Sequence, residues 1–453
     1  MTTVTALTPP STPADICARF NATRRRTLIL CDPLSVEDMM VQSCPEASPA
    51  KWHLAHTAWF FESFILQEFL PSYHLFHPDF PWLFNSYYQT FSRFPEKRLR
   101  SSFSRPGLDD ILHYRGYVDA AIERLFELDL PEEVLRRIEL GIAHEEQHQE
   151  LLLTDMLHAF FTNPLRPIYR PMEAPGESKT AAAPESGDVT DAADRADATD
   201  ADGLEFESFE GGLREAGCGG KDFCFDNELP RHRRWLEPFS LARRLVTCEE
   251  YAAFIADGGY TRPNLWLSAG WDAVMAHGWN APLYWTRKNN EVDGEWRIFT
   301  LRGEQSLADL ASAPVSHVSY YEADAYARWA GKRLATEFEW EAVAEDRPVA
   351  GNLLDADHLM PAEMHRDASV PESRGLVQLW GDCWEWTASA YLAYPGFQPL
   401  PGSLGEYNGK FMSGQMVLRG GSCATPASHI RSSYRNFFSP ETRWQFSGIR
   451  LAS

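Results

Sequence analysis

Hydrophobic and polar positions divide the chain into two parts of different character. In the first part, apolar side chains recur at helical spacing over residues 14–30, 48–70, 108–128 and 135–161. Apolar and aromatic residues cover most of the surface of the 48–70 helix, so it should be largely buried. Four helices with long aromatic connections predict a four-helix bundle, whose interior is available for metal ligands.

The second part, from residue 206 onward, has a less regular pattern. Segments rich in Gly, Trp and Asn alternate with short apolar runs, and helices are expected only at 248–256 and 321–330. This pattern predicts an irregular α+β domain, too rich in loops for a Rossmann fold or a TIM barrel. Residues 166–205 are rich in Ala, Asp, Pro and Ser and predict a flexible acidic linker. The expected fold class is multidomain α and α+β, with parts at 14–165, 166–205 and 206–453.

Composition limits the classes of partner. The formal net charge of -22 argues against nucleic acid and against an anionic membrane surface. No run of eighteen apolar residues exists, and the N-terminus lacks a basic region followed by an apolar one. The 8 cysteines form no CxxC pair, which is typical of reduced thiols. We expect a cytoplasmic protein that acts on small molecules; the sequence does not assign an oligomeric state.

A candidate metal site lies in the last helix of the bundle, in the motif H-E-E-Q-H. His144 and His148 are spaced i and i+4, so two imidazoles on one helix face can reach one metal ion, and Gln147 shares that face. A stable site needs a third ligand. His53 and His56 lie on the apolar 48–70 helix, and spacing alone does not choose between them.

Three neutral histidines would leave coordination positions open for chemistry. Such a set suits Zn(II) with water, or Fe(II) with substrate and dioxygen. The motif also matches the H-E-x-x-H pattern of zinc-dependent hydrolases, with Glu145 as the general base. That alternative assigns no role to most of the chain.

Motifs of the second part resemble formylglycine-generating-enzyme-like sulfatase-modifying domains, which have a C-type-lectin-like fold. A generator of formylglycine uses a cysteine pair shortly after the GGS turn, whereas this chain has Cys423 alone, with Thr425 and Ile430 where the pair is expected. Formylglycine chemistry is therefore not expected. The motifs that carry the resemblance are FCFDNELPRHRRWLEPFSLARRLVTCEEYAAFI, PVSHVSYYEADAYARWAGKRLATEFEWEAVA, LWGDCWEWTAS, VLRGGSCATPASHIRSSYRNFF and SGIRLA.

The first part, with W-x-L-A-H at residues 52–56 and H-E-x-Q-H, resembles the DinB-like domain of the iron-dependent sulfoxide synthases of ergothioneine biosynthesis. The resemblance implies that Fe(II) is held by His56, His144 and His148, which chooses His56 over His53. It also implies an oxidoreductase that joins a thiol sulfur to C2 of hercynine (Nα-trimethylhistidine) and forms a sulfoxide with O2. The alternative within the family is an ovothiol-type 5-histidylcysteine sulfoxide synthase.

The same resemblance assigns residues to the substrates. Gln147 is expected to contact the hercynine imidazole or a bound water, and Asn436 and Tyr407 the betaine end. The motif R-N-F-F consists of Arg435, Asn436, Phe437 and Phe438; the actinobacterial type of this family, which uses γ-glutamylcysteine, has R-N-W-D at this place. A phenyl ring at Phe438 cannot bind the glutamyl ammonium as an aspartate would. This difference predicts cysteine, in place of γ-glutamylcysteine, as the sulfur donor.

The aromatic loop of the bundle supplies the remaining candidates. The actinobacterial type has its catalytic tyrosine where this chain has Leu404, and we expect Tyr87 or Tyr88 to replace it by supplying a proton and an electron. Arginines of the same loop could bind the cysteine carboxylate through charge-assisted contacts. They are Arg93, Arg98 and Arg100.

Overall fold

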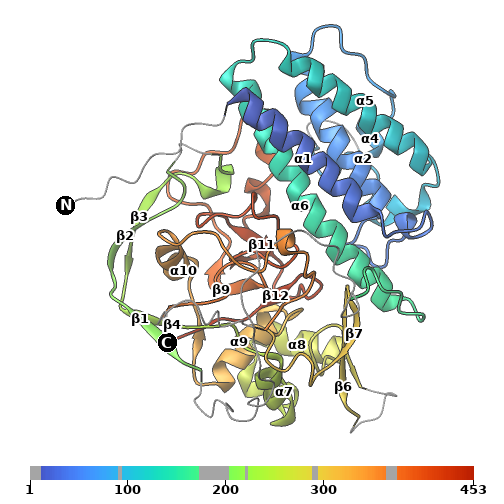
Figure 1. Ribbon diagram of the computed structural model, residues 1–453. Helices are drawn as coiled ribbons and strands as arrows, with labels where there is room; N and C mark the ends of the chain where they lie inside the picture. The colour runs from blue at the N-terminus through green and yellow to red at the C-terminus, as the bar shows by residue number, and fades with distance from the viewer. Residues whose placement is uncertain (1–11, 90–93, 173–203, 220–222, 288–293, 364–374) are drawn as a thin grey trace, which may run out of the picture.

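The computed structural model describes residues 12–89, 94–172, 204–219, 223–287, 294–363 and 375–453. Four long helices form a bundle on one side of the molecule, and the irregular second domain lies against it (Figure 1). The multidomain α and α+β class predicted from the pattern is confirmed. Within the described residues, no helix is long and apolar enough to cross a membrane.

The bundle helices agree closely with the apolar periodicity. Thr12 caps the first helix and Pro131 precedes the last, both at positions that favour helix starts. The second helix is buried along its whole length and continues through a π-helical turn at Glu62–Leu66. The helices are α1 (Pro13–Cys31), α2 (Ala50–Phe61), α3 (Gln67–Phe69), α4 (Phe80–Leu83), α5 (Leu108–Phe126) and α6 (Glu132–Thr162).

Residues 173–203 of the expected linker lie outside the described residues. The segment just before them packs against the protein. Tyr169 is buried, and its hydroxyl donates to the carbonyl of Leu30 at 2.5 Å. The Arg170 amide donates to the carbonyl of Leu301, which ties the end of the bundle to the second domain.

The second domain is built from short strands. One sheet has the order β1-β4-β13-β8 and a second has the order β11-β10-β9-β12, accompanied by the hairpin β2-β3 and the three-stranded sheet β5-β6-β7. The strands are β1 (Phe206–Phe209), β2 (Gly212–Ala216), β3 (His232–Leu236), β4 (Phe239–Ala242), β5 (Trp285–Arg287), β6 (Trp296–Thr300), β7 (Gly303–Ser306), β8 (Arg333–Leu334), β9 (Trp384–Ala390), β10 (Met416–Arg419), β11 (Asn436–Phe438), β12 (Ser447–Gly448) and β13 (Leu451–Ala452).

Four helices of the described second domain accompany these strands, where the sequence predicted two. The expected helices are present as α7 and α9, while two more were not predicted because each is short and rich in aromatic or small residues. The helices are α7 (Cys248–Ala256), α8 (Ser268–His277), α9 (Tyr320–Trp329) and α10 (Glu337–Ala344).

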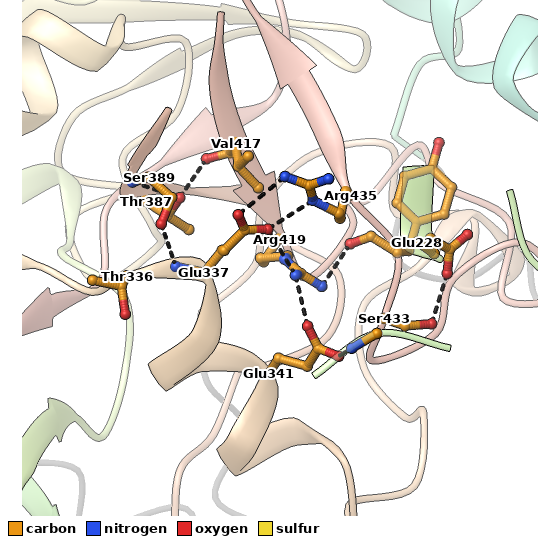
Figure 2. Close-up of polar contacts among 12 residues, drawn as sticks. Glu228, Thr336, Glu337, Glu341, Thr387, Ser389, Val417, Arg419, Ser433 and Arg435 are labelled. Carbon is orange, nitrogen blue, oxygen red and sulfur yellow. Dashed lines mark hydrogen bonds and ion pairs between the residues drawn. The ribbon is translucent and has the colours of Figure 1, made fainter. Parts of the chain in front are cut away.

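A buried ion-pair network ties α10 to the end of β10 and to the residue that precedes β11 (Figure 2). Glu337, at the start of α10, accepts from Arg419 at 3.0 Å and from Arg435 at 2.8 Å. Arg419 also donates to Glu341 at 2.8 Å and to the carbonyl of Tyr434 at 3.0 Å. Because Arg435 lies between Tyr434 and Asn436 in the chain, this network holds both of those residues in place.

Candidate metal centre

Helix α6 is buried on nearly all sides where it carries the H-E-E-Q-H motif, so each polar side chain needs a partner. One stripe, with His144 and His148, faces α2. A second stripe, with Glu145 and Gln149, faces α1: Gln149 donates to the carbonyl of Thr23 at 3.0 Å. A third stripe, with Glu146 and Glu150, faces the second domain. The side chains of this part of α6 therefore contact three different neighbours: α2, α1 and the second domain.

The three histidines expected to bind metal come together at the α2–α6 contact. One nitrogen from each of His56, His144 and His148 lies within 4.8 Å of the other two, and all three side chains are buried. Their ring centroids are 4.6–4.9 Å apart. This spacing is compatible with three ligands of a single ion.

Neighbouring groups fix the orientation of the His56 ring. Its Nδ1 lies 2.6 Å from the carbonyl of Phe84, so Nδ1–H donates there and Nε2 is left as the ligand atom. The ring stacks between two indoles, Trp52 at 4.3 Å and Trp59 at 5.2 Å. Position and tautomer are thus set before any metal binds.

His53, the other histidine that spacing offered, has different contacts from His56. Its Nδ1 lies 2.8 Å from Nδ1 of His148, and its Nε2 lies 3.1 Å from Asp155. The Asp155 carboxylate also accepts from the Ser48 amide at 2.8 Å. The chain carboxylate–His53–His148 orients His148 from behind, as carboxylate–histidine pairs do in metal sites.

Burial keeps the three imidazoles neutral. It lowers the pKa of His144 to about 3 and those of His56 and His148 well below their usual value. Nδ1 of His144 is also buried without a hydrogen-bond partner among the described residues. Three neutral imidazoles without a carboxylate fit Fe(II) or Zn(II) and suit Ca²⁺ or Mg²⁺ poorly, since those ions prefer oxygen ligands.

Glu145 is a structural carboxylate. Its oxygens accept from Arg24, Thr27 and Arg115 at 2.7–2.8 Å. Burial alone would raise its pKa, but the two arginines outweigh burial and lower the pKa to about 2. A general base must reach the metal-bound water, and this group faces α1 instead. Glu145 is therefore not placed to act as the general base that the zinc-hydrolase alternative requires.

Gln147 connects the metal helix to two phenols of the second domain. The Tyr407 hydroxyl donates to Gln147 Oε1, and Gln147 Nε2 donates to the Tyr434 hydroxyl at 2.7 Å. The Tyr407 ring lies edge-on to His144, with centroids 5.7 Å apart. The sequence analysis missed Tyr434; its only signal was its place two residues before Asn436.

Tyr87 and Tyr88 lie one ring farther from the histidines. Tyr87 is 6.5 Å from Tyr407 and stacks on Tyr88 at 4.7 Å. Tyr88 is fully buried and packs 5.7 Å from Trp59. Burial raises the pKa of both phenols, which keeps them protonated.

Asn436, Phe437 and Phe438 of the R-N-F-F motif form β11, whose side chains alternate between two faces. Phe437 stacks on Tyr391 at 4.0 Å and lies 5.8 Å from Phe411, which itself contacts Tyr87. Asn436 accepts from the Phe437 amide at 2.9 Å, and Phe438 pairs with Met416 of β10. Phe437, Phe411 and Tyr87 therefore belong to one continuous aromatic cluster.

The predicted arginines have different environments. Arg98 is exposed and pairs with Glu96 at 2.6 Å. Arg100 is buried, donates to Ser48 at 2.7 Å and covers Trp52 at 3.5 Å, on the same stack as His56. Arg93 lies outside the described residues. Only Arg100 of the two described arginines lies close to the metal helices.

We expect His53→Ala to weaken metal binding by about 10–100-fold, because His148 loses the group that fixes its tautomer. Anaerobic titration with Fe(II) measures the affinity. His158→Ala is a matched control on α6, since that imidazole bonds to Ser43 away from the centre. Equal affinities for His53→Ala and the control would contradict this role.

Comparison with known proteins first defines the class. Residues 196–453 match the family described as Sulfatase-modifying factor enzyme 1-like domain. A hercynine oxygenase from Mycolicibacterium smegmatis is 31% identical, covering 95% of this chain and 96% of that protein.

Other relatives match mainly over half of the chain. A hercynine oxygenase from Mycolicibacterium thermoresistibile is 36% identical over 51% of this chain and 54% of that protein, about half of its length. Ergothioneine biosynthesis protein 1 of Schizosaccharomyces pombe is 30% identical over 51% of this chain and 27% of that protein. The chain belongs to the hercynine oxygenase family, and it is an oxidoreductase.

Proposed function

We propose that this protein is an Fe(II)- and O2-dependent sulfoxide synthase of ergothioneine biosynthesis, which joins the sulfur of cysteine to C2 of hercynine. One arrangement supports the proposal most strongly. Three neutral imidazoles lie together on α2 and α6, and Gln147 of the same helix face forms hydrogen bonds with two phenols of the second domain. The full-length similarity to a hercynine oxygenase supports the same reaction.

The overall reaction balances with one O2. The thiol loses its proton, C2 of the imidazole loses its hydrogen, a C–S bond forms, and one oxygen atom goes to sulfur. The second oxygen atom leaves as water. Fe(II) bound by His56, His144 and His148 would supply redox chemistry and vacant coordination positions for the reactants.

The chain's own residues orient hercynine and the thiol in this proposal. Gln147 contacts the hercynine imidazole, and the Tyr407–Gln147–Tyr434 chain fixes the direction of its amide. Asn436 contacts the betaine end of hercynine, and Phe438, on the same face of β11, occupies the position that would meet a glutamyl ammonium of the thiol. Arg100, whose guanidinium is buried without an ion-pair partner among the described residues, binds the cysteine carboxylate.

The Tyr87–Tyr88 pair lends a proton and an electron during the reaction and takes both back before turnover ends, because the overall reaction already balances with one O2. The Tyr407 hydroxyl already donates to Gln147, so it is less available for this role. The rings of Tyr87 and Tyr88 stack at 4.7 Å, and Tyr87 lies 6.5 Å from Tyr407. Both phenols are protonated at neutral pH and can therefore donate.

We expect Tyr88→Phe to divert product from the sulfoxide toward cysteine sulfinate, with the Tyr87→Phe variant affected in the same direction. Tyr407→Phe should instead raise the KM for hercynine, because Gln147 loses a fixed partner. Product ratios by mass spectrometry, together with initial rates, separate the two effects. Wild-type sulfoxide yield in both Tyr87→Phe and Tyr88→Phe would reject the assignment.

Competition between thiols tests the proposed sulfur donor. The Fe(II)-loaded protein receives hercynine with equal concentrations of cysteine and γ-glutamylcysteine. We expect the cysteine adduct to dominate because Phe438 offers no charge for a glutamyl ammonium. A dominant γ-glutamylcysteine adduct overturns the donor, and an adduct at C5 of the imidazole indicates an ovothiol-type reaction.

A further inference from the structure

The third stripe of α6 attaches the metal helix to the second domain. Glu146 accepts from Ser428 at 2.5 Å, and Thr154 lies 3.5 Å from Gln445. Glu146 also lies 3.4 Å from His429, and Gln147 and Glu150 make further polar contacts with the same domain. Residues 146, 150 and 154 are spaced by four, so they form one line along the helix.

Glu150 has the largest set of partners on this stripe. Its Oε1 accepts from Trp384 Nε1 at 2.7 Å and from the Ser422 hydroxyl at 2.5 Å, and its Oε2 accepts from the Thr425 hydroxyl at 2.8 Å. All three donors belong to the second domain, and all three are neutral. No lysine or arginine forms an ion pair with this carboxylate in the described parts of the chain.

Trp384, Ser422 and Thr425 together form the binding site of this carboxylate, called the socket below, and the turn after β10 supplies Ser422 and Thr425. Gly420 and Gly421 have φ angles of 97° and 81°, which favour glycine. A Cβ added to Gly420 would lie 2.9 Å from the carbonyl of Leu379. The turn continues with the Ser422 amide donating to Thr425 Oγ1 at 2.8 Å, which brings both hydroxyls to the same carboxylate.

The socket and the Gln147 contacts are physically connected. Trp384, which donates to Glu150, packs against Tyr434 with ring centroids 5.6 Å apart, and Tyr434 accepts from Gln147. Gln147 and Glu150 are one helical turn apart on α6. The three histidines, in contrast, all come from α2 and α6. A shift of α6 against the second domain would separate His144 from Tyr407 and leave the metal ligands together.

We propose that Glu150 is a positioning residue for the reaction: its socket of Trp384, Ser422 and Thr425 sets the register of α6 against the second domain. The register determines where Gln147 meets Tyr407 and Tyr434. This inference rests on the proposed function for its catalytic readout, while the docking contact itself is independent of the reaction.

Glu150→Gln tests the inference because it keeps the size of the side chain and removes one acceptor oxygen. The amide NH2 cannot accept a hydrogen bond, so either the Trp384 indole N–H loses its acceptor or the Thr425 hydroxyl must turn to accept, and the contact is weakened in both cases. We expect kcat/KM for hercynine to fall by about 10–100-fold, since misplacement on the order of 1 Å has effects of this size. Fe(II) affinity should stay within about threefold, because second-shell changes that do affect ligands cost about 10-fold or more.

Glu133→Gln is the matched control, an exposed carboxylate on the same helix that pairs with Arg137. We expect wild-type values for it. A double-mutant cycle with Tyr434→Phe separates positioning from a general loss of stability. If Glu150 acts through the Gln147–Tyr434 contact, the two losses in kcat/KM are less than additive. Strictly additive losses, or kcat/KM within twofold of wild type in Glu150→Gln, overturn the proposal.

Hydrogen exchange distinguishes failure of this inference from failure of the proposed function. Exchange is measured without metal or substrate, on peptides covering 416–436 and 144–154. We expect faster exchange in Glu150→Gln than in Glu133→Gln. Unchanged exchange overturns the socket whatever reaction the protein catalyses, whereas faster exchange with no sulfoxide from the wild-type protein supports the socket and rejects the function.

Discussion

Replacing His56 with alanine should abolish sulfoxide formation and weaken Fe(II) binding by at least about 100-fold, more than loss of an outer contact does. His56 is the ligand that α2 contributes, and its ring is fixed by the Phe84 carbonyl and two indoles. His144 and His148 alone leave the ion with two protein ligands, too few for a stable site. Anaerobic metal titration and product analysis measure the two effects.

His113→Ala provides the control for this experiment. That imidazole is exposed on α5, so its loss should leave metal affinity and product yield unchanged. Wild-type Fe(II) affinity in His56→Ala would contradict the three-histidine site. A thermal unfolding measurement on the metal-free proteins shows whether the variant has also lost its fold.

Glu145→Gln should destabilise the protein by about 3–5 kcal/mol, the range found when one partner of a buried ion pair is removed. Arg24 and Arg115 both donate to this fully buried carboxylate, and each would keep its charge without full compensation. Urea unfolding measures the loss. Glu132→Gln, an exposed i,i+4 pair with Arg136, should change stability by less than about 0.5 kcal/mol.

The pH dependence of this loss has a definite sign. The folded-state pKa of Glu145 is about 2, below its ordinary value of 4.5. A lowered folded pKa contributes stability that is present above the unfolded pKa and is lost as pH falls toward the folded pKa. The difference in unfolding free energy between wild type and Glu145→Gln should therefore shrink between pH 4.5 and about 2. A difference that is constant over this window would contradict the assigned pairing.

These two substitutions also separate the oxidoreductase from a hydrolase that uses H-E-x-x-H. In a hydrolase, Glu145 would act on the metal-bound water, and its loss would reduce activity with little effect on stability. The contacts of Glu145 with α1 and α5 predict the opposite order of effects.

The apolar periodicity predicted the bundle well because long helices carry many repeats of the pattern. Helices α8 and α10 are about as short as α7 and α9, but their apolar residues are less confined to one face, so their helical pattern is weaker. The π-helical turn at Glu62–Leu66 also has no signature in a hydrophobic pattern.

The candidate site could be predicted in part. His144 and His148 follow from helical spacing, but His53 and His56 are both plausible by spacing alone. The family resemblance favours His56, and the contacts of His53 with His148 and Asp155 distinguish the two side chains. Glu150 in an isolated sequence looks like a solvated helix residue. Its partners lie more than 230 positions away, so the contact depends on how the two domains pack.

The most direct test of the central claim uses the full chain, reconstituted anaerobically with Fe(II), hercynine and cysteine and then exposed to ¹⁸O-labelled O2. Mass spectrometry follows the product. We expect a hercynine–cysteine sulfoxide that contains one labelled oxygen atom and forms only when Fe(II) is present. Unmodified hercynine, with cysteine sulfinate or no oxidised product at all, would contradict it.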